Sequence, residues 1–271
     1  MRAPPANTPS ANACVGVFDS GVGGLSVLRE IHRLLPDTPT LYYADQAHSP
    51  YGPRSADEIR AFVQSITDFL IEQGALMIVL ACHAASAASL DHLRACYPQI
   101  PIVGIEPAVK PAAEATRSGV IGVLTTQATA DGALYRRVVA RYAAHVRVIT
   151  QVAPDLVTMV EQGRQDEPAS DAILRAHVEP LIDAGADQIV LACTHFPFLK
   201  SNLERITSVP LVDPGAAVAR QVVRILPSAI ATASVVSSAN RYVTSGSPEQ
   251  LQAMLKRLIG VDSAVQAAPD L

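Results

Sequence analysis

The chain has little of what nucleic-acid and membrane proteins depend on. It contains no Trp and only 4% aromatic residues, and 21 Lys and Arg against 25 Asp and Glu give a formal net charge of −4, without a basic block. This composition argues against a base-stacking platform and against a polyanion-binding surface. No apolar run approaches the roughly 18 residues that a membrane helix needs. We therefore expect neither nucleic acid nor a membrane as a partner.

Cysteine is also scarce, and no secretory signal accompanies it. The chain has four Cys among 271 residues, and residues 1–13 contain Arg and Pro but no apolar segment. This pattern fits a reducing compartment better than a disulfide framework. We expect a disordered tail over residues 1–13, a cytoplasmic protein, and cysteines that do chemistry rather than crosslink.

Strand-like and helix-like segments alternate along the rest of the chain. Hydrophobic residues make up 49% of it, enough for a large core. Apolar residues at helical spacing predict helices over Asp57–Gln73 and Asp171–Asp183. Short β-branched runs predict strands at Cys14–Asp19, Thr40–Ala44, Leu76–Ala81, Ile102–Ile105, Val120–Thr125, Val146–Thr150, Gln188–Ala192 and Arg241–Thr244. This alternation is typical of an α/β fold with mainly parallel sheets flanked by helices.

An internal repeat is the most informative feature of the sequence. Residues 74–82 read GALMIVLAC and residues 185–193 read GADQIVLAC, an offset of 193 − 82 = 111. Upstream, VGVFDSG at 15–21 is echoed by IGVLTTQ at 121–127. Buried parallel strands can look alike by composition, but a nine-residue match with a second match upstream indicates a duplication. We predict two pseudo-symmetric lobes.

The repeat also predicts where the active site lies. Ligands of open α/β sheets bind beyond the carboxyl ends of the strands. Each copy of the repeat ends there in a cysteine, Cys82 or Cys193, so facing lobes would present two thiols across one cleft. The predicted segments are a first lobe at 14–104 and 214–260, a second lobe at 105–213, and tails at 1–13 and 261–271.

Two thiols on opposite sides of a cleft suit the inversion of an α-carbon. That reaction removes a proton from one face of the carbon and returns a proton to the other face. Thiols have an ordinary pKa of about 8.5, near enough to neutrality to act as base and acid in turn. Cys82 and Cys193 are therefore the predicted acid–base pair of an amino-acid racemase. Cys14 and Cys96 lack a symmetric counterpart, and we interpret them as structural or incidental.

Several longer motifs follow one another in a fixed order. They are GVFDSGVGGLSVLREI (16–31), YYADQAHSPYGPRS (42–55), IVLACHAASAA (78–88), GIEPAVKPA (104–112), IGVLTTQATADGALY (121–135), IVLACTHFPFL (189–199), LVDPGAAVA (211–219) and RYVTSGSPE (241–249). With DSGVGG, PYG and CTH in this order, the chain resembles the glutamate racemases, within the aspartate/glutamate racemase superfamily. The resemblance implies an isomerase without pyridoxal phosphate, metal or nucleotide. It would convert L-glutamate into D-glutamate in the cytoplasm for peptidoglycan synthesis, cell wall biogenesis and cell shape, with a homodimer as one possible assembly.

The resemblance also implies roles for individual residues. Cys82 and Cys193 would be the two catalytic acid–bases. Asp45 and Glu161, together with His195, would tune the cysteines or the substrate ammonium. The residues expected to contact the substrate are Asp19, Ser20, Tyr51, Gly52, His83, Ala84, Thr126, Thr129, Thr194 and His195.

The chain departs from the family pattern directly after Cys82. The usual motif is Cys-Asn-Thr, whereas this chain has Cys82-His83-Ala84. Ala84 lacks the hydroxyl that the usual Thr gives the substrate carboxylate, a loss of about 1.5–3 kcal/mol if nothing compensates. His83 brings an imidazole that we expect to titrate near neutrality beside Cys82. An altered substrate, such as aspartate or another amino acid, and a non-catalytic interaction role on the same fold stay open as alternatives.

Two other kinds of site compete for the same motifs. Gly21 and Gly23 begin a dinucleotide fingerprint, but Ser26 occupies its third glycine position. We expect these glycines instead to let the backbone pass close to a small anionic ligand. A zinc site would lack the usual C-x2-4-C spacing and would need two adjacent ligands, its members being Cys82, His83, Cys193 and His195. We predict neither a nucleotide nor a metal.

Overall fold

Strands and helices alternate along the chain as the sequence predicts. The structure, a computed structural model, describes residues 12–233 and 240–269. The strands are β1 (Cys14–Asp19), β2 (Thr40–Ala44), β3 (Ala75–Leu80), β4 (Ile102–Gly104), β5 (Val120–Thr125), β6 (Arg147–Val152), β7 (Ile189–Ala192), β8 (Leu211–Val212), β9 (Arg241–Thr244) and β10 (Gln266–Ala267). The helices are α1 (Leu25–Leu34), α2 (Ala56–Glu72), α3 (His83–Cys96), α4 (Val109–Ala115), α5 (Gln127–Ala130), α6 (Ala133–Tyr142), α7 (Pro154–Glu161), α8 (Ser170–Asp183), the short 3-10 helix η1 (Phe196–Leu199), α9 (Lys200–Ile206), α10 (Gly215–Ile225), α11 (Ser228–Ala233) and α12 (Pro248–Ile259).

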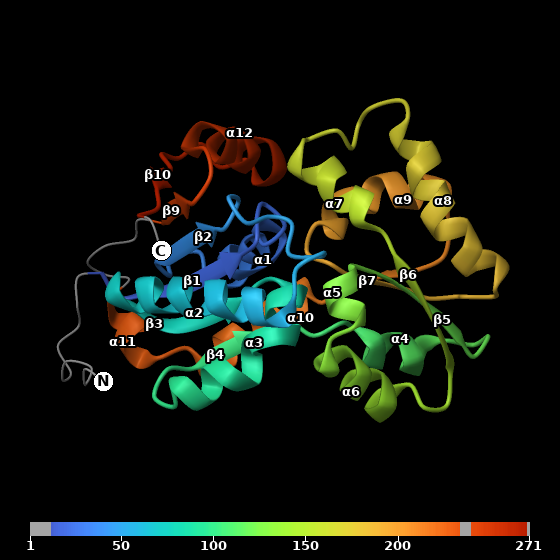
Figure 1. Cartoon of the computed structure of the whole chain (residues 1–271), viewed down its shortest axis with the longest axis horizontal. Coiled ribbons are helices and arrows are strands. Elements are labelled where there is room, and N and C mark those ends of the chain that lie inside the picture. The colour runs from blue at the N-terminus through green and yellow to red at the C-terminus, as the bar shows by residue number, and fades with distance from the viewer. Residues whose placement is uncertain (1–11, 234–239, 270–271) are drawn as a thin grey trace.

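The strands form two parallel sheets, which confirms the predicted fold class. One sheet has the order β10-β9-β2-β1-β3-β4 and the other the order β6-β5-β7-β8. Figure 1 shows the first sheet in one half of the molecule, joined there by β9 and α12 from the end of the chain, and the second sheet in the other half. No helix among residues 12–233 and 240–269 is both long enough and apolar enough to cross a membrane.

The two sheets share one strand order, which gives the sequence repeat a structural meaning. The order β2-β1-β3-β4 in one sheet matches β6-β5-β7-β8 in the other. The register agrees as well, because Gly16 lies opposite Ile78 and Gly122 lies opposite Ile189. These residues hold equivalent places in the two copies of the repeat. The precise lobe boundaries at residues 104 and 213 stay predictions.

The paired glycines let a helix pack closely on each sheet. A Cβ atom at Gly16 would lie 3.4 Å from Leu70 Cβ, and a Cβ atom at Gly122 would lie 3.2 Å from Leu181 Cβ. Leu70 is on α2 and Leu181 is on α8, at an offset of 181 − 70 = 111, the offset of the repeat. The duplication therefore extends from the strands to the helices that cover them.

A capping motif in the sequence fixes the start of α2, whereas the two shortest strands were not predicted. Helix α2 begins after Ser55, whose hydroxyl accepts the N–H of Glu58 at 3.3 Å while the Glu58 carboxylate accepts the N–H of Ser55 at 3.0 Å. Strands β8 and β10 have two residues each, too few to show a period. Strand β10 lies in the segment predicted as a tail, where it pairs with β9. Most of the predicted tail at 1–13 falls outside the described residues.

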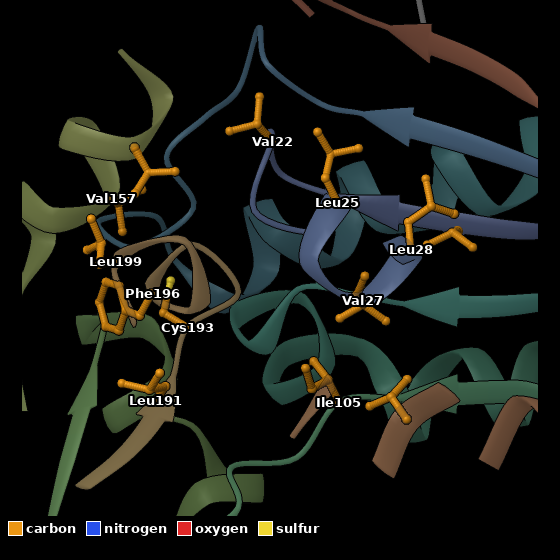
Figure 2. Close-up of a cluster of buried hydrophobic side chains, with 14 of the residues drawn as sticks. Val22, Leu25, Val27, Leu28, Ile105, Val157, Leu191, Cys193, Phe196 and Leu199 are labelled. Atoms are coloured by element: carbon orange, nitrogen blue, oxygen red, sulfur yellow. The ribbon is translucent and has the colours of Figure 1, made fainter. Parts of the chain in front are cut away.

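One apolar core spans both halves of the molecule. Figure 2 shows Val22 and Leu25, which follow β1, in the same cluster as Val157, Cys193 and Phe196 from the second half. All five are buried. Burying a side chain of the size of Val, Leu or Phe contributes about 1.5–3 kcal/mol. This shared core brings the carboxyl ends of the two sheets together around one site.

Candidate active site

A cavity lies where the carboxyl ends of the two sheets meet. Its lining comes from both halves of the molecule and consists of Ser20, Pro50, Tyr51, Gly52, Pro53, Cys82, His83, Ala84, Thr126, Thr129, Pro154, Val157, Cys193, Thr194 and His195. Every predicted site residue is in this lining except Asp19, Asp45 and Glu161, which lie behind it. The analysis of the sequence missed Pro50, Pro53, Pro154 and Val157. Pro50 is the first residue of the PYG motif and Pro53 directly follows it, so both could have been included, whereas Pro154 and Val157 belong to α7, which carries no motif.

Cys82 lies just after β3, where its thiol has few polar neighbours. It is the residue before α3, it is 5% exposed, and its thiol donates to Ser20 Oγ at 3.8 Å. Burial raises the pKa of the Cys82 thiol, and the nearby Asp19 carboxylate raises it further, while the backbone N–H of Ala85 acts in the opposite direction. This environment favours the protonated thiol.

Cys193 stands at the end of β7 beside a histidine. Its Sγ lies 3.6 Å from His195 Nδ1, and His195 Nε2 lies 2.6 Å from Glu161 Oε1. Burial lowers the pKa of His195, but the hydrogen bonds to Cys193 and Glu161 outweigh burial and raise this pKa well above its usual value. Burial likewise raises the pKa of Glu161, and the bond to His195 more than reverses this. The pair is therefore an imidazolium and a carboxylate, and the cation lies against the Cys193 sulfur.

Contacts with the first half of the molecule hold the His195–Glu161 pair in place. The backbone N–H of Val22 donates to Glu161 Oε1 at 2.8 Å. The Ser26 hydroxyl donates to the carbonyl oxygen of Thr194 at 2.9 Å, and the Thr194 hydroxyl donates to Asp19 Oδ2 at 2.9 Å. The chemistry at Cys193 thus depends on residues from both sides of the cavity.

The glycines of the DSGVGG motif leave space for the His195–Glu161 pair. A Cβ atom at Gly21 would lie 1.9 Å from Glu161 Oε1, and a Cβ atom at Gly23 would lie 2.5 Å from His195 Nδ1. Neither distance is compatible with a side chain. The glycines therefore admit protein groups from the second half of the molecule, where we had expected close approach to a ligand.

Asp19 lies beneath the cavity floor with both oxygens in use. The Gly21 N–H donates to its Oδ1 at 2.8 Å, and Thr194 occupies its Oδ2. Burial raises the pKa of Asp19, while the charge of His195 and these two hydrogen bonds act in the opposite direction. Asp19 thus connects the loop after β1 to the loop after β7.

Asp45 supports Tyr51 from behind. Its Oδ2 accepts the Tyr51 hydroxyl at 2.5 Å, and its Oδ1 accepts the Ser245 hydroxyl at 2.8 Å and lies 2.9 Å from His48 Nδ1. Tyr51 in turn lines the cavity. Asp45 therefore acts on the cavity through the position of Tyr51, as part of a network that includes the end of the chain.

The PYG segment and the second-half threonines meet over the cavity. The N–H of Ala128 donates to the carbonyl oxygen of Gly52 at 3.1 Å. Thr126 and Thr129 share a hydrogen bond of 3.2 Å between their hydroxyl oxygens. Both threonines line the cavity, and each hydroxyl can make further hydrogen bonds. This side of the cavity thus combines backbone closure with neutral hydrogen-bonding groups.

His83 and Ala84 begin α3 directly after Cys82. Both line the cavity, and His83 is 3% exposed. Burial lowers the pKa of His83 to about 3. The imidazole is therefore neutral at physiological pH, and the prediction that it titrates near neutrality is wrong, because the sequence does not reveal how completely the ring is buried.

The other two cysteines lie away from the cavity. Cys14 is buried with Arg241 Nη2 3.4 Å from its sulfur, and Cys96 is exposed beside His92. Neither lines the cavity. Within the part of the chain that the structure describes, no three His, Cys, Asp or Glu side chains are grouped so that they could hold a metal ion.

Two duplicated α/β halves thus each contribute one cysteine to a single cavity. The sequence pattern of the Asp/Glu/Hydantoin racemase family matches residues 15–222. The chain belongs to this family.

Individual relatives narrow the similarity further. The chain is 51% identical over 257 residues to a glutamate racemase of Ectopseudomonas mendocina, covering 94% of this chain and 98% of that protein. Among solved structures, it resembles the RacE1 glutamate racemase of Bacillus anthracis with a TM-score of 0.84 and 29% identity, covering 96% of this chain and 98% of that one. It also resembles Escherichia coli glutamate racemase in complex with L-glutamate and the activator UDP-MurNAc-ala, with a TM-score of 0.82 and 32% identity over 96% and 99% of the two chains.

Proposed function

We propose that this protein racemises glutamate by moving protons between Cys82, Cys193 and the two faces of the α-carbon. The observation that carries the proposal is that both thiols line one buried cavity from equivalent positions in the two halves. The names of the relatives and the L-glutamate bound to the Escherichia coli protein support glutamate as the substrate.

The two thiols begin the reaction in opposite protonation states. In the proposed scheme Cys193, which contacts the His195 cation, starts as the thiolate. Cys82 starts as the thiol, because burial and the Asp19 carboxylate raise its pKa. The Cys193 thiolate takes the α-proton from one face, and the electron pair left on the α-carbon spreads into the adjacent carboxylate. Cys82 then gives its proton to the opposite face. The enzyme is left with the protonation states exchanged, ready to process the other enantiomer.

Neutral groups hold the substrate in this scheme. No Lys or Arg is among the described residues that line the cavity. The hydroxyls of Ser20, Thr126 and Thr129 and backbone N–H groups bind the carboxylates, while the His195 imidazolium supplies the positive charge. Hydrogen bonds to a charged group contribute about 1.5–3 kcal/mol each. A few of them therefore suffice to bind the two carboxylates of glutamate.

Isotope exchange tests this function directly. The purified protein is incubated with L- or D-glutamate in heavy water, and deuterium at the α-carbon is followed by NMR. We expect incorporation from both enantiomers, with Cys82→Ser and Cys193→Ser variants as controls. Aspartate and other amino acids are run in parallel, because the Cys82-His83-Ala84 sequence favours an altered substrate as the second candidate. Exchange with none of them would contradict the racemase assignment and favour a non-catalytic role.

The remaining predictions concern the setting of the reaction. A cytoplasmic enzyme that supplies D-glutamate for peptidoglycan would leave a cell without it dependent on external D-glutamate. A homodimer would appear as a doubled mass in light scattering coupled to size-exclusion chromatography. Both are extensions of the proposed function and are tested independently of it.

A further inference from the structure

The end of strand β9 holds the side chain of Gln46. Strand β9 pairs with β2 in parallel, with Thr244 opposite Ala44, so its end lies beside the segment that follows β2 (Figure 1). Thr244 is fully buried, and its hydroxyl donates to Gln46 Oε1, the nearer of two acceptors, at 2.9 Å. A strand from near the end of the chain thus reaches a loop at the carboxyl end of the first sheet.

Gln46 connects this strand to Glu161 in the second half of the molecule. Its side chain forms a hydrogen bond with the Glu161 side chain. A carboxylate only accepts hydrogen bonds, so the NH2 group of the Gln46 amide is the donor. Thr244 favours this orientation of the amide, because its hydroxyl accepts the N–H of Gly246 at 3.0 Å and donates to the amide oxygen. A flipped amide would place its oxygen against the carboxylate.

Gly246 leaves the space that Gln46 occupies. A Cβ atom at residue 246 would lie 2.8 Å from Gln46 Cβ and 3.5 Å from its Oε1. The first distance is too short for a real side chain. The hydroxyl of Thr244 and the missing Cβ at residue 246 therefore serve the same amide.

Glu161 extends this chain of contacts to Cys193. Its Oε1 lies 2.6 Å from His195 Nε2, and His195 Nδ1 lies 3.6 Å from the Cys193 sulfur. Glu161 is the last residue of α7, and the dipole of a helix disfavours a carboxylate at its carboxyl end. Donors from outside the helix are therefore needed to hold this carboxylate. The first half of the molecule supplies two of them, the N–H of Val22 and the amide of Gln46.

We propose that Gln46, oriented by Thr244, is a positioning residue that places Glu161, and through it His195, against Cys193. Gln46 does not line the cavity, so it acts without touching the substrate. Its effect on turnover rests on the proposed function. Its effect on the His195–Glu161 pair does not, because that pair can be observed in the free protein.

Gln46→Met tests this role, because Met has a similar length and lacks the amide. We expect kcat/KM for glutamate to fall about 10-fold, mainly through kcat, because one hydrogen bond to a charged group is lost away from the substrate. Gln64→Met is the matched control. Gln64 Nε2 also donates to a carboxylate, that of Asp68 at 3.4 Å, but on α2 and away from the cavity. Equal kcat/KM values in the two variants would overturn the proposal.

NMR of ¹⁵N-labelled histidine in the free protein separates positioning from a purely structural role. The hydrogen bond from Gln46 helps to lower the pKa of Glu161, and Glu161 helps to raise the pKa of His195. His195 should therefore lose its proton at a lower pH in Gln46→Met than in the parent protein. An unmoved titration would overturn the proposal even if turnover fell. A shifted titration supports it even if the parent protein fails to racemise glutamate, an outcome that would contradict the proposed function alone.

The other titratable groups that face the His195–Glu161 pair are Asp19, Tyr42 and Cys193. None of them is altered in Gln46→Met. A shift in the titration of His195 can therefore be assigned to the lost amide.

A double-mutant cycle tests the part of Thr244. Thr244→Val removes the hydroxyl and should lower kcat/KM, and Thr244→Ser should recover most of the loss. The double variant with Gln46→Met should be no slower than Gln46→Met alone, because both changes act on one contact. Losses that multiply would overturn the role of Thr244. Should either single variant fail to fold, Gly246→Ala takes its place, because the added Cβ would displace Gln46. An unchanged kcat/KM in Gly246→Ala would then overturn the proposal.

Discussion

Cys82 and Cys193 occupy equivalent places in a duplicated fold, yet their surroundings differ in charge. Each follows an interior strand of a parallel sheet, β3 or β7, and both are buried. Cys82 faces the carboxylate of Asp19 and a weak hydroxyl contact, whereas Cys193 faces an imidazolium backed by Glu161. The duplication thus fixes where the sulfur atoms lie, and the neighbours decide which of them carries the proton.

The residues that create this difference lie at equivalent positions of the repeat. At the offset of 111, Ala84 corresponds to His195, since 195 − 84 = 111, and His83 corresponds to Thr194. The two copies are alike up to the cysteine and diverge immediately after it. In a symmetric pair either thiol would be equally ready to carry a single shared proton, whereas this divergence makes the surroundings of the two sulfurs unequal.

The largest expected effect comes from replacing either thiol. Cys82→Ser and Cys193→Ser should each reduce racemisation at least about 1,000-fold, because a serine hydroxyl is far too weak an acid to take part in proton transfer. The rate is measured by circular dichroism of glutamate. Cys14→Ser and Cys96→Ser should retain turnover. A comparable loss in all four variants would indicate damage to folding and would remove the support for this pair.

Removing the imidazolium should sharpen the contrast between the two thiols. His195→Asn should lower kcat/KM about 100-fold at neutral pH, because the Cys193 sulfur loses the cation that lies 3.6 Å from it. His177→Asn is the control, since His177 pairs with Asp155 at 2.7 Å in the same half but away from the cavity. An equal kcat/KM in His195→Asn and His177→Asn would contradict a role of His195 at Cys193.

The equivalence of the two halves can be tested at the paired glycines. A Cβ atom at Gly16 would lie 3.0 Å from Ala75 Cβ, and one at Gly122 would lie 2.9 Å from Leu181 Cδ1. Each Gly→Ala change should lower the free energy of unfolding by about 1–3 kcal/mol, as overpacking does. The loss should be larger at Gly16, because the Ala75 methyl group cannot rotate away. Urea denaturation gives these values, and a stabilising effect at either site would break the comparison.

The smallest effect concerns stability against pH. The pKa of Glu161 is lowered from 4.5, so its contribution to stability is present above pH 4.5 and is lost as the pH falls through the lowered value. The pKa of His195 is raised from 6.5, so its contribution is complete below pH 6.5 and is lost as the pH rises through the raised value. Glu161→Gln should therefore lower the melting temperature by about 2–4 °C, most between pH 4.5 and 6.5. Calorimetry showing the same difference at every pH would contradict this.

Much of the fold follows from local sequence patterns. Continuous apolar runs such as those of β3 and β7 mark buried parallel strands, and their shared ending in Cys marks the site. The motifs of the family add the remaining residues of the cavity. These signals lie within short stretches, and for that reason a sequence without a structure reveals them.

The features that could not be predicted arise from contacts between distant residues. The bond between Val22 and Glu161 joins residues that are 139 positions apart in the sequence. The residues around Gly21 therefore do not reveal that a glycine is needed there to leave space for the Glu161 carboxylate. Val157 reaches the cavity because of how the halves pack, which no local pattern encodes. The neutral state of His83 depends on complete burial, again a property of the assembled core.

The bond from Val22 to Glu161 has a consequence for the timing of the reaction. Any movement that separates the two halves to admit or release an amino acid must break this bond and the Asp19–Thr194 bond with it. Both bonds also help to position the His195–Glu161 pair, whose imidazole contacts the Cys193 sulfur. Contact between the two halves and the position of the His195–Glu161 pair beside Cys193 are therefore coupled. The Cys193 sulfur therefore has the His195 imidazolium beside it in the arrangement that these bonds maintain.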